Sequence, residues 1–442
     1  MVKIFLKNWP VILLLFLALL TRFIFLSYPS EVVFDEVHFG KFVSSYFNHE
    51  YYFDIHPPLG KLMIAGFFWI SNKATISDPE KTFSQIGENL DKNILFSLRF
   101  LPAFFGALLV VLVYKLVIVF GFSKKSAFLA GFLVLFDNAF LVQSKFILVD
   151  IFLVFFGTLS LYFYFLYRKK PILILFILSA IFAAFSFSIK WTGLSFYFLI
   201  FIAFLVDTAR NFKIRDFIVK TLILIIIPFL VYLLVFVIHF KILSEPGSGD
   251  TFMNRDFQNL NLWQKFIELN QTMLKRNSEI KVSHPFSSKW YQWPIIKKPI
   301  FYWLKNLNGR IGNIYLLGNP LVWWPVLVSI IFSFFIILRR KFRRKLPLLF
   351  YFFLSGYFIN LLPYIAISRV TFLYHYLPSL LFGILILVFF WEKVISPSRF
   401  SYYLIFLALV FFSFLVLSPL TYGFLISPKA NEIYNILIKF LS

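Results

Sequence analysis

The sequence "WPVILLLFLALLTRFIFLSY", residues 9–28, decides the fold class, because its 20 residues carry a single charge, at Arg22. A helix of about 20 apolar residues crosses the hydrocarbon core of a bilayer. The run continues past Arg22, and no small-residue cleavage site follows it. We therefore expect a retained first span rather than a cleaved signal peptide.

Similar apolar runs recur along the whole chain. Of its 442 residues, 60% are hydrophobic and only 14% are charged, a composition that a water-soluble protein could not bury. The runs are long and continuous, whereas the strands of a membrane barrel alternate. We predict an all-α polytopic membrane protein with about eleven transmembrane helices in a single domain, residues 1–442. The expected spans cover residues 9–28, 95–120, 126–144, 147–167, 171–188, 191–207, 217–240, 319–338, 346–367, 371–391 and 401–424.

Lysine and arginine predict the orientation, since they gather in the cytoplasmic loops of membrane proteins. With the N-terminus in the cytoplasm, every strongly basic loop lies inside, including "RKK" at 168–170 and "RRKFRRK" at 339–345. The first long loop (29–94), the large loop (241–318) and the C-terminus are then extracytoplasmic. These inside loops explain most of the formal net charge of +23, so we expect no nucleic acid partner.

The first loop is rich in ionisable groups. Its stretch "FDEVHFGKFVSSYFNHEYYFDIHPPLGK", residues 34–61, holds four carboxylates, three histidines and two lysines. The apolar segment 57–70 is too short for a span and predicts a juxtamembrane helix. Cations also lie at or near the ends of spans at the same membrane depth: Arg22, Arg99, Lys145, Lys190 and Arg369. Together, these charges predict a site for a lipid-borne anionic substrate, with cations holding a phosphate and a carboxylate acting as base.

Structural explanations stay open for each of these groups. Lysine and arginine at span ends often only reach the lipid headgroups, and Lys145 could form a structural ion pair with Asp150. Asp35 and Glu36 are neighbours, so their side chains point in different directions. One of them should therefore act as base while the other braces a cation such as Arg22 or Arg99. Asp35, Glu36, His38, Asp54 and His56 could supply metal ligands, but no spacing in the loop matches a zinc or calcium signature. We therefore predict no cofactor and leave a divalent metal open as an alternative.

The stretch at 34–61 resembles the first extracytoplasmic loop of the protein O-mannosyltransferases, membrane glycosyltransferases of the GT-C type. The shared features are an Asp-Glu pair, a His-Phe-Gly and "DIHPPLGK". Further matches cover almost the whole chain in order. They are "LRFLPAFFG" (98–106), "DNAFLVQSKFILVD" (137–150), "SIKWTGL" (188–194), "SHPFSSKWYQWP" (283–294) and "RVTFLYHYLP" (369–378).

The resemblance implies a GT-C fold and an inverting transfer of mannose from a polyprenyl-phosphate mannose to Ser and Thr hydroxyls of exported polypeptides. It implies Asp35 as the general base, supported by Glu36, Arg22 and Arg99. With these we group Lys145, Lys190 and Arg369 as donor phosphate ligands. Relatives often have Arg in place of Lys145, which would hold a phosphate less specifically. The residues expected to bind acceptor and sugar are His38, Asp54, His56, His284, Trp290, Trp293 and His375.

The expected location is the cell membrane, with the active site and C-terminus extracytoplasmic and an association with the export machinery. Eukaryotic relatives carry a MIR domain in the large loop, and 241–318 is too short for one, so the chain resembles a prokaryotic form. One alternative is a GT-C enzyme that moves another sugar onto lipid or glycan. The other is a transporter of lipid-linked sugars, although no internal repeat supports it.

Overall fold

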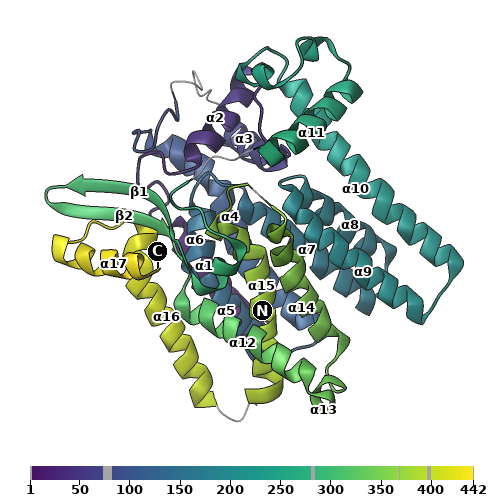
Figure 1. Cartoon of the computed structure of the whole chain (residues 1–442). Coiled ribbons are helices and arrows are strands. Elements are labelled where there is room, and N and C mark those ends of the chain that lie inside the picture. Colours follow the sequence, from purple (N-terminus) through teal and green to yellow (C-terminus); the bar gives the residue numbers. More distant parts are fainter. Residues whose placement is uncertain (1, 73–81, 280–283, 368, 396–399, 442) are drawn as a thin grey trace.

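Long apolar helices run side by side through the body of the molecule, and shorter elements cover one of its ends (Figure 1). The computed structural model describes residues 2–72, 82–279, 284–367, 369–395 and 400–441. Most of these residues are helical, so the prediction of a helical membrane protein is confirmed.

Among the described residues, eight helices are long and apolar enough to cross a membrane, some with a short 3-10 or π turn at one end. They are α4 (Lys92–Val119), α7 (Asp150–Lys169), α9 (Leu194–Arg210), α10 (Ile214–Ile242), α12 (Pro320–Leu338), α14 (Leu348–Leu361), α15 (Leu377–Phe390) and α16 (Phe400–Tyr422). Two shorter apolar helices, α1 (Val2–Phe23) and α8 (Leu173–Phe187), coincide with predicted spans, and α3 (Leu59–Asn72) with the predicted juxtamembrane helix. The count of eleven spans stays a prediction.

A ninth candidate span is bent by 58° into α5 (Lys124–Leu135) and α6 (Asn138–Lys145). Asp137 holds the bend. Its carboxylate accepts the backbone N–H of Phe140 at 3.0 Å and so caps α6. The other oxygen accepts the backbone N–H of Asn319 at 3.0 Å and the indole N–H of Trp323 at 2.7 Å. The continuous span predicted at 126–144 is therefore broken by a buried polar cap.

The core of the bundle surrounds α15, whose apolar window is wholly buried within the protein. Small residues let neighbouring helices approach it. At Gly356 of α14, an added Cβ would lie 2.3 Å from the ring of Phe382 on α15. Close packing at small residues is typical of membrane helices. α14 and α15 therefore pack closely at this point.

This end, which we call the site face, carries α2 (Glu36–Asn48), α3 and α11 (Leu262–Glu279), which cap the spans (Figure 1). It also carries a hairpin of β1 (Ile300–Leu307) and β2 (Arg310–Leu316), and the last helix, α17 (Pro428–Leu441). The hairpin is the exception to the predicted all-α fold. Its turn residues Asn308 and Gly309 have φ angles of 50° and 72°, the left-handed pair that a two-residue hairpin turn requires.

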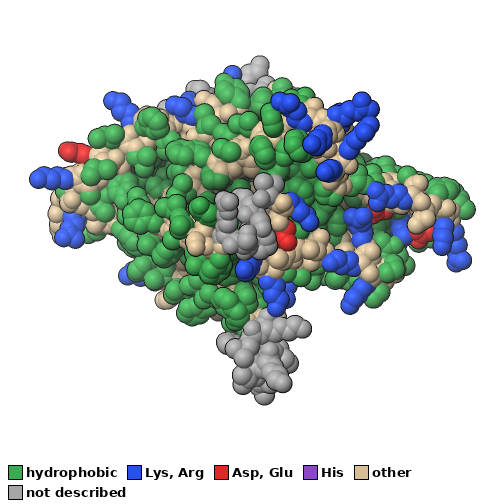
Figure 2. Space-filling model, turned by 90° about the horizontal axis from the view of Figure 1, so that it is seen from below, with side chains coloured by type: hydrophobic (Ala, Val, Ile, Leu, Met, Phe, Trp, Pro, Cys, Tyr) green, Lys and Arg blue, Asp and Glu red, His purple; other side chains and the backbone are tan. Residues whose placement is uncertain are grey.

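The opposite end, which we call the basic face, holds the loops rich in lysine and arginine. Figure 2 shows many cationic side chains on it and few anionic ones. They include those of α13 (Arg340–Arg343), which links α12 to α14. Cationic side chains thus outnumber anionic ones on this face.

Candidate active site

Asp35 lies in the turn between α1 and α2, directly after a strained residue. The backbone of Phe34 is left-handed, with φ 42°, a conformation that costs a non-glycine residue about 1–3 kcal/mol. The hairpin holds it there. The N–H of Phe34 donates to the carbonyl oxygen of Tyr302 at 3.1 Å, and the two rings stack with their centroids 4.3 Å apart. Asp35 thereby becomes the N-cap residue of α2.

Asp35 lines a cleft of about 520 Å³ on the site face. The walls come from two loops that are far apart in the sequence. The lining residues are Asp35, His38, Phe39, Phe42, Phe53, Asp54, Ile55, His56, Phe252, Arg276 and Glu279. The first loop therefore supplies the ionisable floor that the sequence predicts, and the large loop closes one side.

Within the described part of the chain, the carboxylate of Asp35 has no hydrogen-bond partner. Asp35 is half-buried. Burial raises its pKa to about 7, and the negative charges of Asp150 and Asp54 add to this rise. The positive charge of Lys190 opposes it. A carboxylate whose pKa lies near neutrality is suited to accept a proton from a substrate.

Glu36, the neighbour of Asp35, points into the protein and is fully buried. Its carboxylate binds the guanidinium of Arg99 through two hydrogen bonds, of 2.8 and 2.7 Å. It also accepts the backbone N–H groups of Val33 and Ile147, each at 2.9 Å. The two adjacent carboxylates thus have different surroundings, and Glu36 is the one that braces a cation.

Three of the predicted phosphate ligands are fully buried, and their charged groups donate to protein acceptors. Besides Glu36, Arg99 donates to three backbone carbonyl groups. Arg22 donates to the carbonyl oxygens of Leu135 at 3.2 Å and Val134 at 3.4 Å, at the end of α5. Lys145 donates to two carbonyl groups just beyond α1, and its ammonium lies 4.3 Å from the ring centroid of Tyr422. This geometry favours structural roles for Arg22, Arg99 and Lys145.

Lys190 and Arg369, the other two predicted phosphate ligands, do not line the cleft, but their charges act on residues that do. Lys190 forms an ion pair of 2.8 Å with Asp150. Arg369 is half-buried, and no ion pair to it occurs within the described residues. Both charges act on His56, whose pKa is held well below its ordinary value by burial first and then by Lys190 and Arg369. His56 is therefore neutral, and the cations that act on it are Lys190, Arg369 and Lys61.

Asp54 is fixed by Lys61, which the sequence analysis quoted but did not assign. The ammonium of Lys61 forms an ion pair with the Asp54 carboxylate and donates to the carbonyl oxygen of His56 at 2.9 Å. It lies 5.6 and 5.7 Å from the ring centroids of Phe42 and Tyr52. Lys61 thus sets the position of two cleft residues that are seven and five residues before it.

The other residues predicted to bind acceptor or sugar lie in different surroundings. His38 lines the cleft, with Asp54 and His56. Trp293 and His375 stack in a buried cluster, with ring centroids 5.9 Å apart, and do not line the cleft. His284 does not line the cleft, and its ring contacts that of Phe34 edge-on with the centroids 6.5 Å apart. Trp290 is half-buried and contacts Tyr291.

Sequence reasoning missed Asp150, Tyr302, Arg276 and Glu279. Asp150 was considered as a partner of Lys145, but it pairs with Lys190 instead. Arg276 and Glu279 reach the cleft from α11, and no sequence pattern relates that helix to the first loop. No group of three or more potential metal ligands was found in the described ranges.

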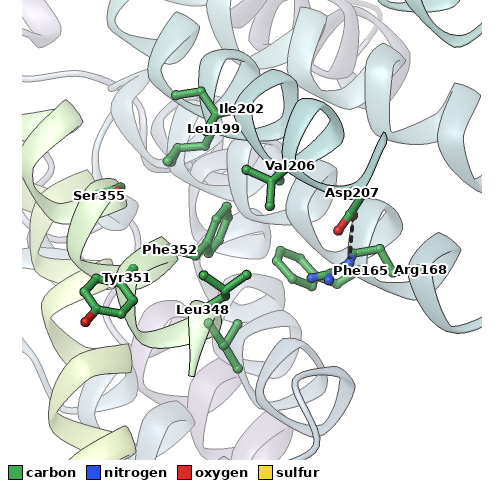
Figure 3. A pocket seen from close by; sticks show the side chains of 12 residues that line it. Phe165, Arg168, Leu199, Ile202, Val206, Asp207, Leu348, Tyr351, Phe352 and Ser355 are labelled. Atoms are coloured by element: carbon green, nitrogen blue, oxygen red, sulfur yellow. Dashed lines mark ion pairs between the residues drawn. The ribbon is translucent and has the colours of Figure 1, made fainter. Parts of the chain in front are cut away.

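A second cavity, of about 270 Å³, lies between α7, α9 and α14 (Figure 3). Its walls are mostly apolar, and at one end Arg168 and Asp207 form an ion pair of 2.9 Å. Both residues are near the ends of their helices on the basic face. The cavity contains none of the predicted site residues, so the Asp35 cleft is the candidate active site.

Residues 12–244 match the model of a family described as dolichyl-phosphate-mannose-protein mannosyltransferase. Residues 262–437 match the C-terminal four TMM region of protein-O-mannosyltransferase. The chain is 34% identical over 261 residues to dolichyl-phosphate-mannose–protein mannosyltransferase 4 of Candida albicans, covering 55% of this chain and 34% of that protein. It is 35% identical over 274 residues to protein O-mannosyltransferase 1 of Drosophila melanogaster, covering 58% and 30%. The chain spans about a third of the length of these relatives.

Solved structures share the fold. The S. cerevisiae protein O-mannosyltransferase Pmt1-Pmt2 complex bound to the sugar donor gives a TM-score of 0.86 at 19% identity, covering 94% of this chain and 90% of that chain. The apo ArnT of Cupriavidus metallidurans gives a TM-score of 0.53 at 14% identity, covering 91% and 63%. The helical arrangement is therefore that of the GT-C glycosyltransferases.

Proposed function

The chain belongs to the dolichyl-phosphate-mannose-protein mannosyltransferase family, and on that premise we propose that it transfers mannose from a polyprenyl-phosphate mannose to Ser and Thr hydroxyls of exported polypeptides. The names of its relatives support the reaction, and the donor-bound yeast complex supports the type of donor. Such an enzyme needs a base, a site for the phosphate and a groove for the acceptor. The Asp35 cleft and the cations whose charges act on it offer candidates for each.

Asp35 is the proposed general base. It accepts the hydroxyl proton while the hydroxyl oxygen attacks C1 of mannose from the side opposite the phosphate. The bond between C1 and the phosphate oxygen breaks, its electron pair leaves with the polyprenyl phosphate, and the anomeric configuration inverts. The observation that carries this proposal is the carboxylate of Asp35, which lines the cleft, lacks a partner among the described residues and has a pKa of about 7.

Lys190 and Arg369 are the proposed phosphate ligands. A phosphate leaving group is already stabilised, so it requires cations rather than a proton donor. Arg369 can offer a planar pair of N–H donors to two phosphate oxygens. Lys190 would share its charge between Asp150 and the phosphate. In this proposal Arg22, Arg99 and Lys145 hold the surrounding loops and helix ends, and do not contact the donor.

The acceptor polypeptide would enter through the open cleft beside Asp54, His56 and His38. Roles for His284, Trp290, Trp293 and His375 in binding acceptor or sugar stay a prediction. We place the site face outside the cytoplasm and the chain in the cell membrane. The cationic side chains on the basic face support that orientation, because such residues gather on the cytoplasmic side (Figure 2).

The test is an assay of membranes that contain the full chain. They receive radiolabelled polyprenyl-phosphate mannose and a peptide with Ser and Thr residues. We expect label in the peptide that depends on the chain and is lost in Asp35→Asn. If the label reaches only lipid or glycan, the proposal is overturned in favour of another GT-C transferase. If Asp35→Asn labels the peptide at the full rate, Asp35 is not part of the mechanism.

A further inference from the structure

The last helix, α17, exposes a narrow strip of large apolar side chains. Ile433, Ile436 and Phe440 are 68%, 70% and 73% exposed. At roughly 100° per residue, these three positions lie within about 60° of one another on the helix. The neighbouring sector is exposed and polar and contains Glu432, Asn435 and Lys439. The remaining sector packs against the protein, with Leu441 4% exposed.

The position of α17 relative to α16 indicates its depth in the membrane. Figure 1 shows α17 crosswise at the end of α16 on the site face. The hydroxyl of Tyr434 donates to the carbonyl oxygen of Val416 at 2.7 Å. Val416 lies six residues before the end of α16, or about 9 Å inside it at 1.5 Å per residue. α17 therefore lies beside the outermost turns of a membrane span.

The neighbouring helix α16 also exposes large apolar side chains. On α16, Phe412 is 64% exposed and Leu415 is 47% exposed, as expected for side chains in contact with acyl chains. Lys429 and Lys439 lie near the two ends of α17, where they can reach lipid phosphates. We propose that α17 is an interfacial helix that inserts Ile433, Ile436 and Phe440 into the leaflet on the site face.

Through the hairpin, lipid contact at α17 would stabilise the turn that carries Asp35. Ile311 of β2 and Ile426 exchange two backbone hydrogen bonds, each of 3.0 Å. The amide of Asn313 donates to Asn431 at 2.7 Å, at the first turn of α17. The hairpin continues to Tyr302, which holds the strained residue before Asp35. In this part the inference rests on the proposed function, whereas the lipid contact itself does not.

The chain contains no cysteine, so a single cysteine can report on each side of α17. Full-length Ile436→Cys and Asn435→Cys are placed in phosphatidylcholine–phosphatidylglycerol vesicles, with a polar, membrane-impermeant maleimide on both sides of the bilayer. We expect Asn435→Cys to react at least about tenfold faster than Ile436→Cys, because a thiol in the acyl layer is shielded from the reagent. Equal rates would overturn the proposal. Phe440→Cys and Lys439→Cys form a second pair if the first does not fold.

The same experiment at increasing lipid excess separates lipid from a second copy of the chain. Protection of Ile436→Cys that persists at about one chain per vesicle supports lipid contact. Protection that disappears on dilution would assign the strip to a protein interface and overturn the proposal. The labelling rate requires no turnover, so its outcome is independent of the proposed transferase activity.

Discussion

Arg99 and Glu36 form a doubly hydrogen-bonded ion pair, and both side chains are fully buried. The pair ties α4 to the first turn of α2. Glu36 has no free hydrogen-bonding capacity for a substrate, because two backbone N–H groups occupy its remaining lone pairs. The pair thus fixes the turn on which Asp35 is presented to the cleft.

Asp35→Asn should lower the rate of sugar transfer by about 10²–10⁴-fold, because the amide cannot accept the hydroxyl proton. Binding of the donor should change little, since the proposed phosphate ligands are unaltered. Initial rates and donor affinity, measured on the same preparation, check both statements. A variant that retains normal turnover would show that another group is the base.

Arg99→Ala should lower the free energy of unfolding by about 3–5 kcal/mol, because it leaves the Glu36 carboxylate buried without its cation. Thermal unfolding in detergent measures the effect. The double variant Glu36→Leu, Arg99→Met should be more stable than Arg99→Ala, because neither charge is then left unpaired. If Arg99→Ala leaves the free energy of unfolding unchanged and lowers only the affinity for the donor, Arg99 is a phosphate ligand.

Arg369→Ala and Lys190→Ala should each raise the KM for polyprenyl-phosphate mannose by about 10–100-fold, the loss expected for one hydrogen bond between charged groups. Arg369→Lys should recover part of the loss, since it keeps the charge but not the two parallel donors. Lys289→Ala, which removes an exposed cation outside the cleft, serves as the matched control. An unchanged KM in both variants would place the phosphate elsewhere.

The pH dependence of kcat/KM should show an acidic limb centred at about 7, because Asp35 must be ionised to accept a proton. Asp54 raises the pKa of Asp35, so Asp54→Asn should move the limb to lower pH. Lys190 lowers it, so Lys190→Met should move the limb to higher pH. Rate profiles from pH 5 to 9 would check both shifts. A limb that stays in place in both variants would mean that it reports a different group.

The helical fold could be predicted because a membrane span is a local property of about 20 residues. The bend between α5 and α6 could not, since Asp137 breaks the span through contacts with Asn319 and Trp323, about 180 residues further on. The hairpin had a usable signal in Asn308–Gly309, the strongest short-range mark of a two-residue turn. The sequence analysis considered the length of the surrounding loop and its motif at 283–294, and missed this turn.

The candidate site was predicted in part, and the limits have one cause. Motif spacing located the first loop and the membrane depth of the cations, but not the direction in which each cation points. Arg22 and Lys145 meet carbonyl groups more than 100 residues away in the sequence, whereas Lys190 forms an ion pair with Asp150. Sequence alone does not distinguish these environments, because each is created by helix packing.

The rings of Phe53 and Phe252 stack at the cleft with their centroids 4.8 Å apart, and they join the first loop to the large loop. This contact is separate from the hydrogen bonds between Glu36 and Arg99 that hold Asp35. Under the proposed function, exchanging these two rings for other side chains should change the range of acceptors, while the turn that carries Asp35 keeps its own support.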